Sequence, residues 1–584
     1  MPSSISGRRC IAPAPAGKLI RMTSTDRGVA RYGLLLLCIA GLGGLLYGID
    51  IGIIAGALLY LQKAVSLTIE QQSLIVAAVL AGGTVGSFIA GPLADWFGRK
   101  KMMVSSGLLF VLSVAIIVSS HSFNPIFAGR ILQGLSGGFI GVVIPLYLAE
   151  SLSAETRGRG TAVFQFALTI GIVAASLSGF LYTRQAEASI AAAGTNALLV
   201  KVAANHAWRS IFLSIIYPGA LFALGSFWLS ESPRWLFKKG RKEAAFAALR
   251  RSSGEAAAEE QMREMELLAA EAVTKKKTTH SDSLLRRKYV IPFALACVIL
   301  ACNQATGINS VLSFLVVMLK QAGMASARAS QGDLAVKVLN CVMTVVAVAL
   351  VDKKGRKFLL EIGTGGIIIA LLAGAFFFHS FESKRVDMRS QIESLETGNA
   401  LHIANVTDML RSENVTGAAA VTVMYSYGDG DKSVTVLSTD TDPSVTIAPD
   451  PAKPNATLTI KKAFHGPVPS ERTGWLITGC IALFIASFAV GPGVVVWLAL
   501  SELMPTRIRS VGMGVALLLN QGISTAIAAL FLPMVGLYGY YAIFLVWAGC
   551  TVIYFITATF FLPETKGKTL EQIEEHFEGK AAAA

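Results

Sequence analysis

Long apolar stretches alternate with short polar segments along the whole chain. Twelve stretches are long enough to cross a bilayer, since a membrane-spanning helix needs roughly 20 predominantly apolar residues. The pattern predicts an all-α membrane protein in which one polar segment, between the ninth and tenth spans, folds separately. The predicted spans are 33–62, 70–92, 102–119, 124–149, 160–182, 208–230, 289–319, 333–351, 358–380, 474–500, 510–533 and 539–562.

Composition and charge agree with a membrane protein. Of 584 residues, 53% are hydrophobic and only 15% are charged, against about 25% charged residues in ordinary soluble proteins. A net charge of +14 is compatible with a protein that binds nucleic acid. The charges, however, fall in short clusters between apolar spans, as membrane topology requires. We therefore expect a lipid bilayer, and no nucleic acid, as partner. The loops between spans contain no cysteine, so we expect no disulfide framework.

The basic residues predict the orientation. With the N-terminus inside, most of the 51 Lys and Arg residues lie on the inner side, as the positive-inside rule requires. We expect a multi-pass protein of the plasma (cell inner) membrane with both termini cytoplasmic. The expected parts are a cytoplasmic tail 1–32, a six-helix half 33–230, a cytoplasmic linker of short helices 231–288, a second six-helix half 289–562, and a cytoplasmic tail 563–584. The alternative interpretation is that residues 231–288 form a flexible tether between the two halves.

The polar insertion at 381–473 is expected on the outer side. Its second half alternates β-branched and polar residues around Asp-Gly and Pro turns, which predicts a small β-rich module. Asn405, Asn414 and Asn455 each begin an Asn-x-Thr pattern, which is a glycosylation acceptor in a secretory pathway. Chance occurrence in a Thr-rich loop is the interpretation we favour for these three sites.

Two charged motifs recur in the same order in the two halves. In one, Asp and two further residues precede Gly-Arg-Lys; in the other, Glu is followed seven residues later by Arg. The pairs are Asp95 with Arg99, Asp352 with Arg356, Glu150 with Arg157, and Glu502 with Arg509. The repeat indicates a 6+6 duplication. Because carboxylates and guanidinium groups form bidentate hydrogen bonds, we expect these eight residues to form a cytoplasmic gate. Ordinary flanking charge, the alternative, does not explain the repeated spacing.

A set of motifs resembles the sugar porter family of the major facilitator superfamily. The set consists of residues 91–101 and 352–357, GRILQGLSGG around Arg130, Glu150 to Arg157, SPRW at 232–235, NQATGIN at 303–309 and PETKGK at 563–568. The resemblance implies two six-helix halves that rock around a substrate site near the bilayer midplane. It extends over nearly all of the membrane part of the chain.

The resemblance also implies which residues bind substrate. By motif position these are Gln165, Gln304, Asn309, Asn340, Trp497 and Asn520. An amide donates and accepts hydrogen bonds without carrying charge, which suits the hydroxyls of a hexose, a pentose or myo-inositol, and an indole packs on the C–H face of a ring. An interhelical hydrogen bond is the alternative for any one of them. Gln304 and Asn309 are five residues apart, off one helical face, and Gly307 between them permits a broken helix.

Asp50 and Arg130 carry the functional prediction. We interpret them as the only acid and the only base deep within a span, and such residues mark by default a proton or substrate pathway. The resemblance adds that proton symporters have Asp at the position of Asp50, where uniporters are neutral. We expect Asp50 to load and release a proton as its distance from Arg130 changes. A static ion pair is the alternative.

These observations predict a secondary active transporter that couples a proton gradient to uptake of a monosaccharide or cyclic polyol. A facilitative uniporter and, less favoured because of the short C-terminal tail, a non-transporting sugar sensor remain alternatives. We expect no enzyme, since the sequence shows neither a phosphate loop nor a metal-spaced His/Cys cluster nor a nucleophile triad. We also expect no cofactor and no metal, and a protein that functions as a monomer.

Overall fold

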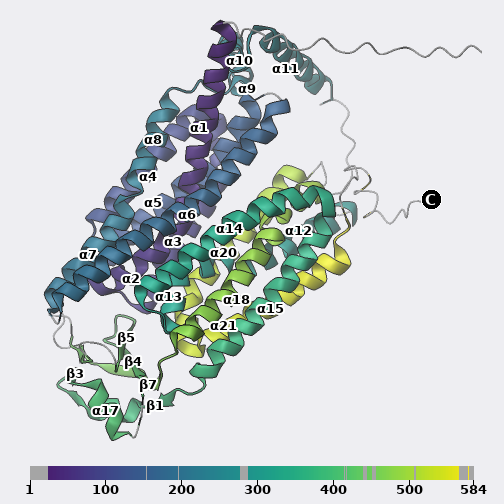
Figure 1. Cartoon of the computed structure of the whole chain (residues 1–584). Coiled ribbons are helices and arrows are strands. Elements are labelled where there is room, and N and C mark those ends of the chain that lie inside the picture. Colours follow the sequence, from purple (N-terminus) through teal and green to yellow (C-terminus); the bar gives the residue numbers. More distant parts are fainter. Residues whose placement is uncertain are drawn as a thin grey trace, which may run out of the picture.

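The computed structural model describes two helical halves and a small sheet module (Figure 1). The described residues are 24–152, 154–194, 196–275, 287–413, 415, 417–438, 443–449, 456–504, 508–564, 572 and 577. Within them, twelve helical segments are long and apolar enough to cross a membrane. The predicted all-α architecture of twelve spans is confirmed.

The N-terminal half contains six spans. Its helices are α1 (Ser24–Gly52), α2 (Ile54–Ala64), α3 (Ile69–Phe97), α4 (Arg99–Ser119), α5 (Phe123–Ser151), α6 (Ala154–Ala193), α7 (Ala197–Leu213) and α8 (Ile216–Phe227). Helix α1 thus begins within the expected tail. Helices α6 and α7 extend into residues 183–207, which separate the fifth and sixth predicted spans, because that segment is rich in alanine, the residue with the highest helix propensity.

The C-terminal half contains the other six spans. Its helices are α12 (Arg287–Ala305), α13 (Ile308–Gln321), α14 (Ser326–Lys354), α15 (Arg356–Glu382), α18 (Glu471–Val490), α19 (Pro492–Leu503), α20 (Arg509–Tyr538), α21 (Tyr540–Ile556) and the π-helical turn η1 (Thr557–Phe561). Between the halves lie three linker helices: α9 (Pro233–Lys238), α10 (Lys242–Ser253) and α11 (Glu255–Lys275). We name the side with these helices the linker side.

Glycines bring the helices of the N-terminal half close together. Gly44 and Gly48 of α1 lie against the backbone of α6, and a Cβ on Gly48 would be 1.9 Å from the carbonyl oxygen of Leu168. Apolar helices in lipid gain little from hydrophobic association and instead associate through small residues that permit close packing. Large apolar side chains such as Phe88 and Phe560 are 68% and 75% exposed, as expected for surfaces that face lipid.

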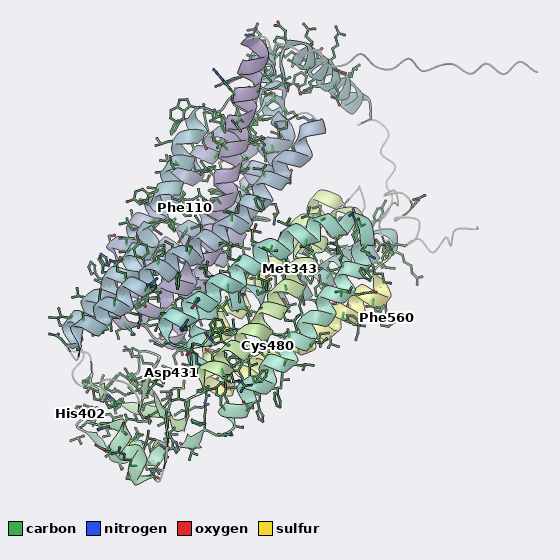
Figure 2. The ribbon with its side chains drawn as sticks, viewed as in Figure 1. Phe110, Met343, His402, Asp431, Cys480 and Phe560 are labelled. Atoms are coloured by element: carbon green, nitrogen blue, oxygen red, sulfur yellow. The ribbon has the colours of Figure 1, made fainter. Side chains whose placement is uncertain are left out.

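The insertion between α15 and α18 contains two antiparallel sheets, with strand orders β1-β7-β4-β5 and β2-β3-β6. The elements are β1 (Val386–Asp387), α16 (Arg389–Ser394), β2 (Glu396–Thr397), β3 (Ala400–Ile403), α17 (Val406–Ser412), β4 (Ala419–Ser426), β5 (Asp431–Leu437), β6 (Val445–Ile447) and β7 (Thr459–Pro467). Figure 2 shows His402 and Asp431 in this module, beyond the ends of the long helices. The predicted β-rich module is confirmed, and we name its side the module side.

The module contacts both halves. The Lys462 ammonium donates to the carbonyl of Leu537, at the end of α20, over 2.9 Å, and Gly430 of the β4–β5 turn lies against Thr68, which caps α3. Asn405 caps α17, with its side chain accepting from the Thr407 N–H over 2.8 Å. The other two Asn-x-Thr sites, at 414 and 455, lie outside the described residues.

The two halves pack against each other on the module side. There α3 contacts α20, α6 contacts α14, and α2 contacts α13. The backbone N–H of Leu532 in α20 donates to the Ser73 hydroxyl in α3 over 3.1 Å, which fixes one of these contacts. Toward the linker side the ribbons of the two halves diverge (Figure 1).

Candidate functional site

A buried ion pair lies between α1 and α5. Asp50 is 3% exposed and Arg130 is 1% exposed, and the Arg130 Nη1 lies 3.8 Å from Asp50 Oδ1. Gly137 of α5 lets the carboxylate lie against that helix, since a Cβ there would be 3.0 Å from Asp50 Oδ2. The structure therefore brings together the two residues that the sequence assigns to proton coupling.

Arg130 has further partners besides the carboxylate. Its Nη1 donates to the Gln133 side-chain oxygen over 2.9 Å, and its Nε donates to the Ile75 carbonyl over 3.4 Å. The guanidinium carbon also lies 5.7 Å from the centre of the Phe212 ring, a cation–π distance. The guanidinium would thus stay solvated by the protein if Asp50 became neutral.

An amide cluster forms where the seventh span is broken. Helix α12 ends at Ala305 and α13 begins at Ile308, and Gly307 between them has a left-handed φ of +83°. The break brings Asn309 Nδ2 to 3.0 Å from the Gln304 Oε1. The Gln304 Nε2 in turn donates to Asn520 of α20 over 3.3 Å. Three of the predicted substrate residues are therefore linked in one cluster.

One member of this cluster has no counterpart in the sequence prediction. The Ser524 hydroxyl accepts from Asn309 Nδ2 over 2.7 Å. Ser524 lies four residues after Asn520, so the two share a helical face, and that spacing was the signal that could have identified it. Asn520 is anchored in place because its Nδ2 donates to the Leu300 carbonyl over 2.9 Å.

The remaining predicted substrate residues are placed as follows. Gln165 is exposed on α6 and Asn340 is half-buried on α14, and these two helices belong to opposite halves that contact each other. The side chain of Trp497 lies outside the described part of the structure. Neither Gln165 nor Asn340 is among the residues that the cluster hydrogen bonds connect.

Three of the four predicted gate residues of the N-terminal half meet on the linker side. The Arg99 guanidinium lies 2.9 Å from Asp95 Oδ1 and 2.8 Å from Glu150 Oε2. Ser232 of the linker donates to Glu150 over 2.5 Å, and the Trp235 indole donates to the Asp95 carbonyl over 2.9 Å. These bonds join α3, α4 and α5 to α9 within one half.

The gate residues of the C-terminal half are described only in part. Arg356 begins α15, and its Nη1 donates to the Val351 carbonyl over 3.4 Å. The side chains of the other predicted gate residues, Arg157, Asp352, Glu502 and Arg509, lie outside the described part of the structure.

Two acids that the sequence analysis did not assign extend the internal repeat. Glu231 accepts from the backbone N–H groups of Arg99 and Lys100 over 2.8 and 3.0 Å. Glu564 accepts from the N–H groups of Arg356 and Lys357, both over 3.1 Å. Each acid follows the last span of its half and binds the first turn of that half's third span. A carboxylate there also interacts favourably with the helix dipole.

We predict that Glu231→Ala lowers stability by about 1–3 kcal/mol, because two N–H groups lose a charged acceptor. Glu564→Ala should have a similar effect in the other half. Thermal unfolding in detergent, followed by tryptophan fluorescence, measures both. Glu260→Ala, at an exposed position of α11, is the control. Equal melting temperatures for all three variants would contradict the capping role.

A second buried ion pair lies within the eighth candidate membrane span. Asp333 is 3% exposed and Lys337 is fully buried, with 2.9 Å between Lys337 Nζ and Asp333 Oδ1. The interpretation of Asp50 and Arg130 as the only deep charges is therefore wrong. The prediction began the eighth span at residue 333 and so placed Asp333 at its edge. In the structure α14 begins seven residues earlier, at Ser326, so the pair is inside.

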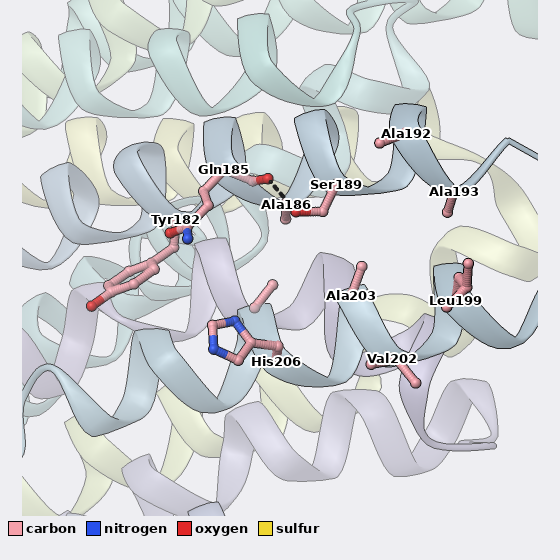
Figure 3. Close-up of a pocket in the computed structure, with 11 residues that line it drawn as sticks. Tyr182, Gln185, Ala186, Ser189, Ala192, Ala193, Leu199, Val202, Ala203 and His206 are labelled. Carbon is pink, nitrogen blue, oxygen red and sulfur yellow. Dashed lines mark hydrogen bonds between the residues drawn. The ribbon is translucent and has the colours of Figure 1, made fainter.

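A pocket of about 470 Å³ lies apart from all these residues (Figure 3). It is formed by α6 and α7 at the module side, within the N-terminal half. Tyr182, Ser189 and His206 line it together with small apolar side chains. It contains none of the predicted site residues.

The sequence matches a known family over most of its length. The model of the family described as "Sugar (and other) transporter" matches residues 36–390 and 457–577. The chain belongs to the sugar porter family of the major facilitator superfamily. The unmatched interval lies within the module and contains the strands β2 to β6.

Curated relatives of this sugar porter cover nearly its whole length. The glucose transporter GlcP of Staphylococcus epidermidis is 26% identical over 94% of this chain and 98% of that protein. "Probable inositol transporter 2" of Arabidopsis thaliana is 28% identical over 94% and 92%. The arabinose-proton symporter of Bacillus subtilis is 26% identical over 93% and 95%. The protein is thus a membrane sugar transporter and not an enzyme.

Solved structures share the fold. The inward open conformation of the xylose transporter XylE from E. coli matches with a TM-score of 0.63 at 20% identity, over 92% of this chain and 98% of that one. A D-xylose-proton symporter matches with a TM-score of 0.62 at 22% identity, over 92% and 100%. The predicted sugar porter fold of two six-helix halves is confirmed.

Proposed function

We propose that this sugar porter is a proton-coupled symporter of a monosaccharide or cyclic polyol. The observation that carries the proposal is the carboxylate of Asp50, which is buried among membrane-spanning helices beside Arg130. A charge at such a depth is costly and marks functional sites. One relative is named as an arabinose-proton symporter, and one similar solved structure is named as a D-xylose-proton symporter. Both names support proton coupling here.

The geometry supports a simple proton cycle. Ionised Asp50 attracts Arg130 across 3.8 Å. Protonated Asp50 releases it, and the guanidinium then keeps its bonds to Gln133 and the Ile75 carbonyl. Arg130 therefore has hydrogen-bond acceptors whether Asp50 is ionised or neutral. Asp50 can bind and release a proton without leaving the buried guanidinium without a partner. The oxygens that accept hydrogen bonds from Arg130 belong to α3 and α5, so a shift of α1 would move the carboxylate relative to the guanidinium.

The amide cluster supports a neutral, polyhydroxylated substrate. In the structure Gln304 and Asn309 bond to each other and to groups of α20. A sugar hydroxyl both donates and accepts, so it can replace each of these bonds without leaving a buried amide unpaired. The printed names of the relatives include glucose, inositol and arabinose, which fits this class of substrate.

We further propose the following placement in the cell. The linker side faces the cytoplasm and the module faces outward, because the linker and its flanking segments are strongly basic. The contact between the halves on the module side supports an inward-facing state. We also propose that the protein lies in the plasma membrane and works as a monomer.

Uptake into proteoliposomes tests the proposal. The purified protein is reconstituted, a pH gradient with acid outside is imposed, and labelled glucose, xylose, arabinose and myo-inositol are offered separately. A symporter accumulates its substrate above the outside concentration, and a protonophore abolishes the accumulation. A uniporter equilibrates the sugar without accumulation, and a sensor shows no flux at all; either result contradicts symport.

The cluster residues should set substrate affinity. We predict that Gln304→Ala and Asn309→Ala each raise the half-saturating sugar concentration about tenfold or more, since each removes a hydrogen-bonding partner from the substrate. Gln521→Ala is the matched control, because Gln521 adjoins Asn520 on α20 but makes none of the cluster's bonds. Concentration-dependent uptake measures all three. Unchanged half-saturation in both cluster variants would place the substrate elsewhere.

A further inference from the structure

The pair of Asp333 and Lys337 lies deep within α14. The residues are 7 and 11 positions from the start of the helix at Ser326, which corresponds to roughly 10 and 16 Å along its axis. Lys337 Nζ lies 2.9 Å from one carboxylate oxygen of Asp333 and 3.0 Å from the other. The two charges thus neutralise each other on one face of a single helix.

Each charge also contacts the opposite half. The Ser176 hydroxyl of α6 donates a short hydrogen bond to Asp333 Oδ2. Lys337 Nζ donates to the carbonyl of Gly52, the last residue of α1, over 3.4 Å. The pair therefore joins α14 of the C-terminal half to α1 and α6 of the N-terminal half.

Weaker contacts continue this seam between α6 and α14. Nearer the module, the Ser330 hydroxyl donates to Thr183 over 3.3 Å. Toward the linker side, the Thr169 hydroxyl lies 3.4 Å from the Cys341 sulfur. Among the described contacts between α6 and α14 the charged pair is the most polar, and each of these two flanking contacts is a single bond between uncharged groups.

Stability alone does not account for a charged pair at this place. Burying two charges costs several kcal/mol each, and well-packed apolar residues are often as stabilising. Because Asp333 and Lys337 are on the same helix, they stay paired when the halves separate. On separation of the halves the pair itself loses its bonds to Ser176 and Gly52, and water entering the seam then hydrates both charges. The arrangement is therefore suited to a contact that repeatedly forms and breaks.

We propose that Asp333 and Lys337, with Ser176 and the Gly52 carbonyl, form a module-side latch. The latch holds the two halves together in the state seen here and opens when the transporter faces outward. Gly52 is two residues from Asp50, so opening the latch also frees the end of α1 that carries the proton site. The proposal rests on alternating access in a sugar porter and does not depend on proton coupling.

Cys341 provides a native probe of the latch. With the other six cysteines replaced by serine or alanine, right-side-out membrane vesicles are treated with a membrane-impermeant maleimide, and the rate of Cys341 labelling is measured. Access from the module side requires the seam to open. His402→Cys, at an exposed position of the module (Figure 2), is the positive control for exposure to the outside.

The latch predicts faster labelling when a cross-half bond is removed. Ser176→Ala should raise the rate about tenfold, as expected for loss of a hydrogen bond to a buried charge, and Lys337→Met should raise it at least as much. Ser176→Thr, which keeps the hydroxyl, should restore the original rate. Ser226→Ala is the matched control, because that equally buried hydroxyl bonds to the Phe222 carbonyl within its own helix.

The outcomes separate a latch from a purely structural pair. A structural pair would lower the melting temperature of Ser176→Ala or Lys337→Met while leaving Cys341 as slow to react as in Ser226→Ala, and that result would overturn the proposal. If Lys337→Met fails to fold, Ser176→Ala decides alone, since it changes neither charge. The labelling needs no sugar and no pH gradient, so failure of proton symport leaves its outcome unaffected.

Discussion

Asp50→Asn will abolish sugar accumulation driven by a pH gradient while sugar exchange at equal pH continues. The substitution keeps the size and shape of the side chain but removes the group that can ionise. Without a proton to load and release, the carrier can still change conformation with sugar bound, which exchange reports. We expect accumulation to fall to the equilibrium level, and counterflow of labelled sugar in proteoliposomes to stay within about threefold of the unmodified protein, because the surrounding hydrogen bonds to Arg130 persist.

Two variants sharpen this prediction. Asp50→Glu keeps an ionisable group and should retain part of the accumulation. Glu361→Gln, which neutralises a half-buried acid near the start of α15, is the matched control and should leave accumulation unchanged. If Asp50→Asn accumulates sugar as well as Glu361→Gln does, the proton site lies elsewhere.

Gly307→Ala will disrupt the seventh span and with it the substrate site. A Cβ at this position would lie 2.4 Å from the indole of Trp547, and the left-handed φ of +83° disfavours any side chain. Strain and overpacking together should cost about 2–4 kcal/mol. Because the break holds Gln304 and Asn309 together, we expect transport to fall below a tenth of its original rate even in protein that remains folded.

The control for this variant lies on α21, the helix that a side chain at position 307 would contact. Gly549→Ala, two residues from Trp547 on α21, places its Cβ where no atom lies within 4 Å. It should be neutral or slightly stabilising, since alanine is favoured over glycine within a helix. Melting temperature and initial uptake rate are measured for both. A Gly307→Ala protein that melts and transports like Gly549→Ala would show that the broken helix is not required.

The hydrophobic pattern predicted the number and order of the spans well, because each must be apolar over a bilayer's thickness. It placed their ends less well. Helices α6 and α7 continue through an Ala-rich segment that hydropathy treats as a loop, since helix propensity there is independent of lipid contact. The early start of α14 had the larger consequence, because it moved Asp333 from the edge of a span to its interior.

Contacts between distant segments explain what the sequence could not predict. The pairing of Asp50 with Arg130 was predictable from the sequence, because charged residues are rare within apolar spans. Ser524 and Ser176, by contrast, are common residues in transmembrane helices, and only the packing of α13 on α20 and of α6 on α14 gives them charged or amide partners. Glu231 and Glu564 belong to recognised motifs, but their bonds to the start of α4 and α15 depend on how each half folds back on itself.

Proton movement on addition of sugar tests coupling most directly. Proteoliposomes are held in weakly buffered medium with no pH gradient and with the membrane potential clamped by potassium and valinomycin. A transported sugar is then added outside while the external pH is recorded. Proton symport predicts alkalinisation of the medium at the rate of sugar entry, with one proton taken up per sugar, and none in Asp50→Asn. Sugar entry without any change in external pH would contradict proton coupling.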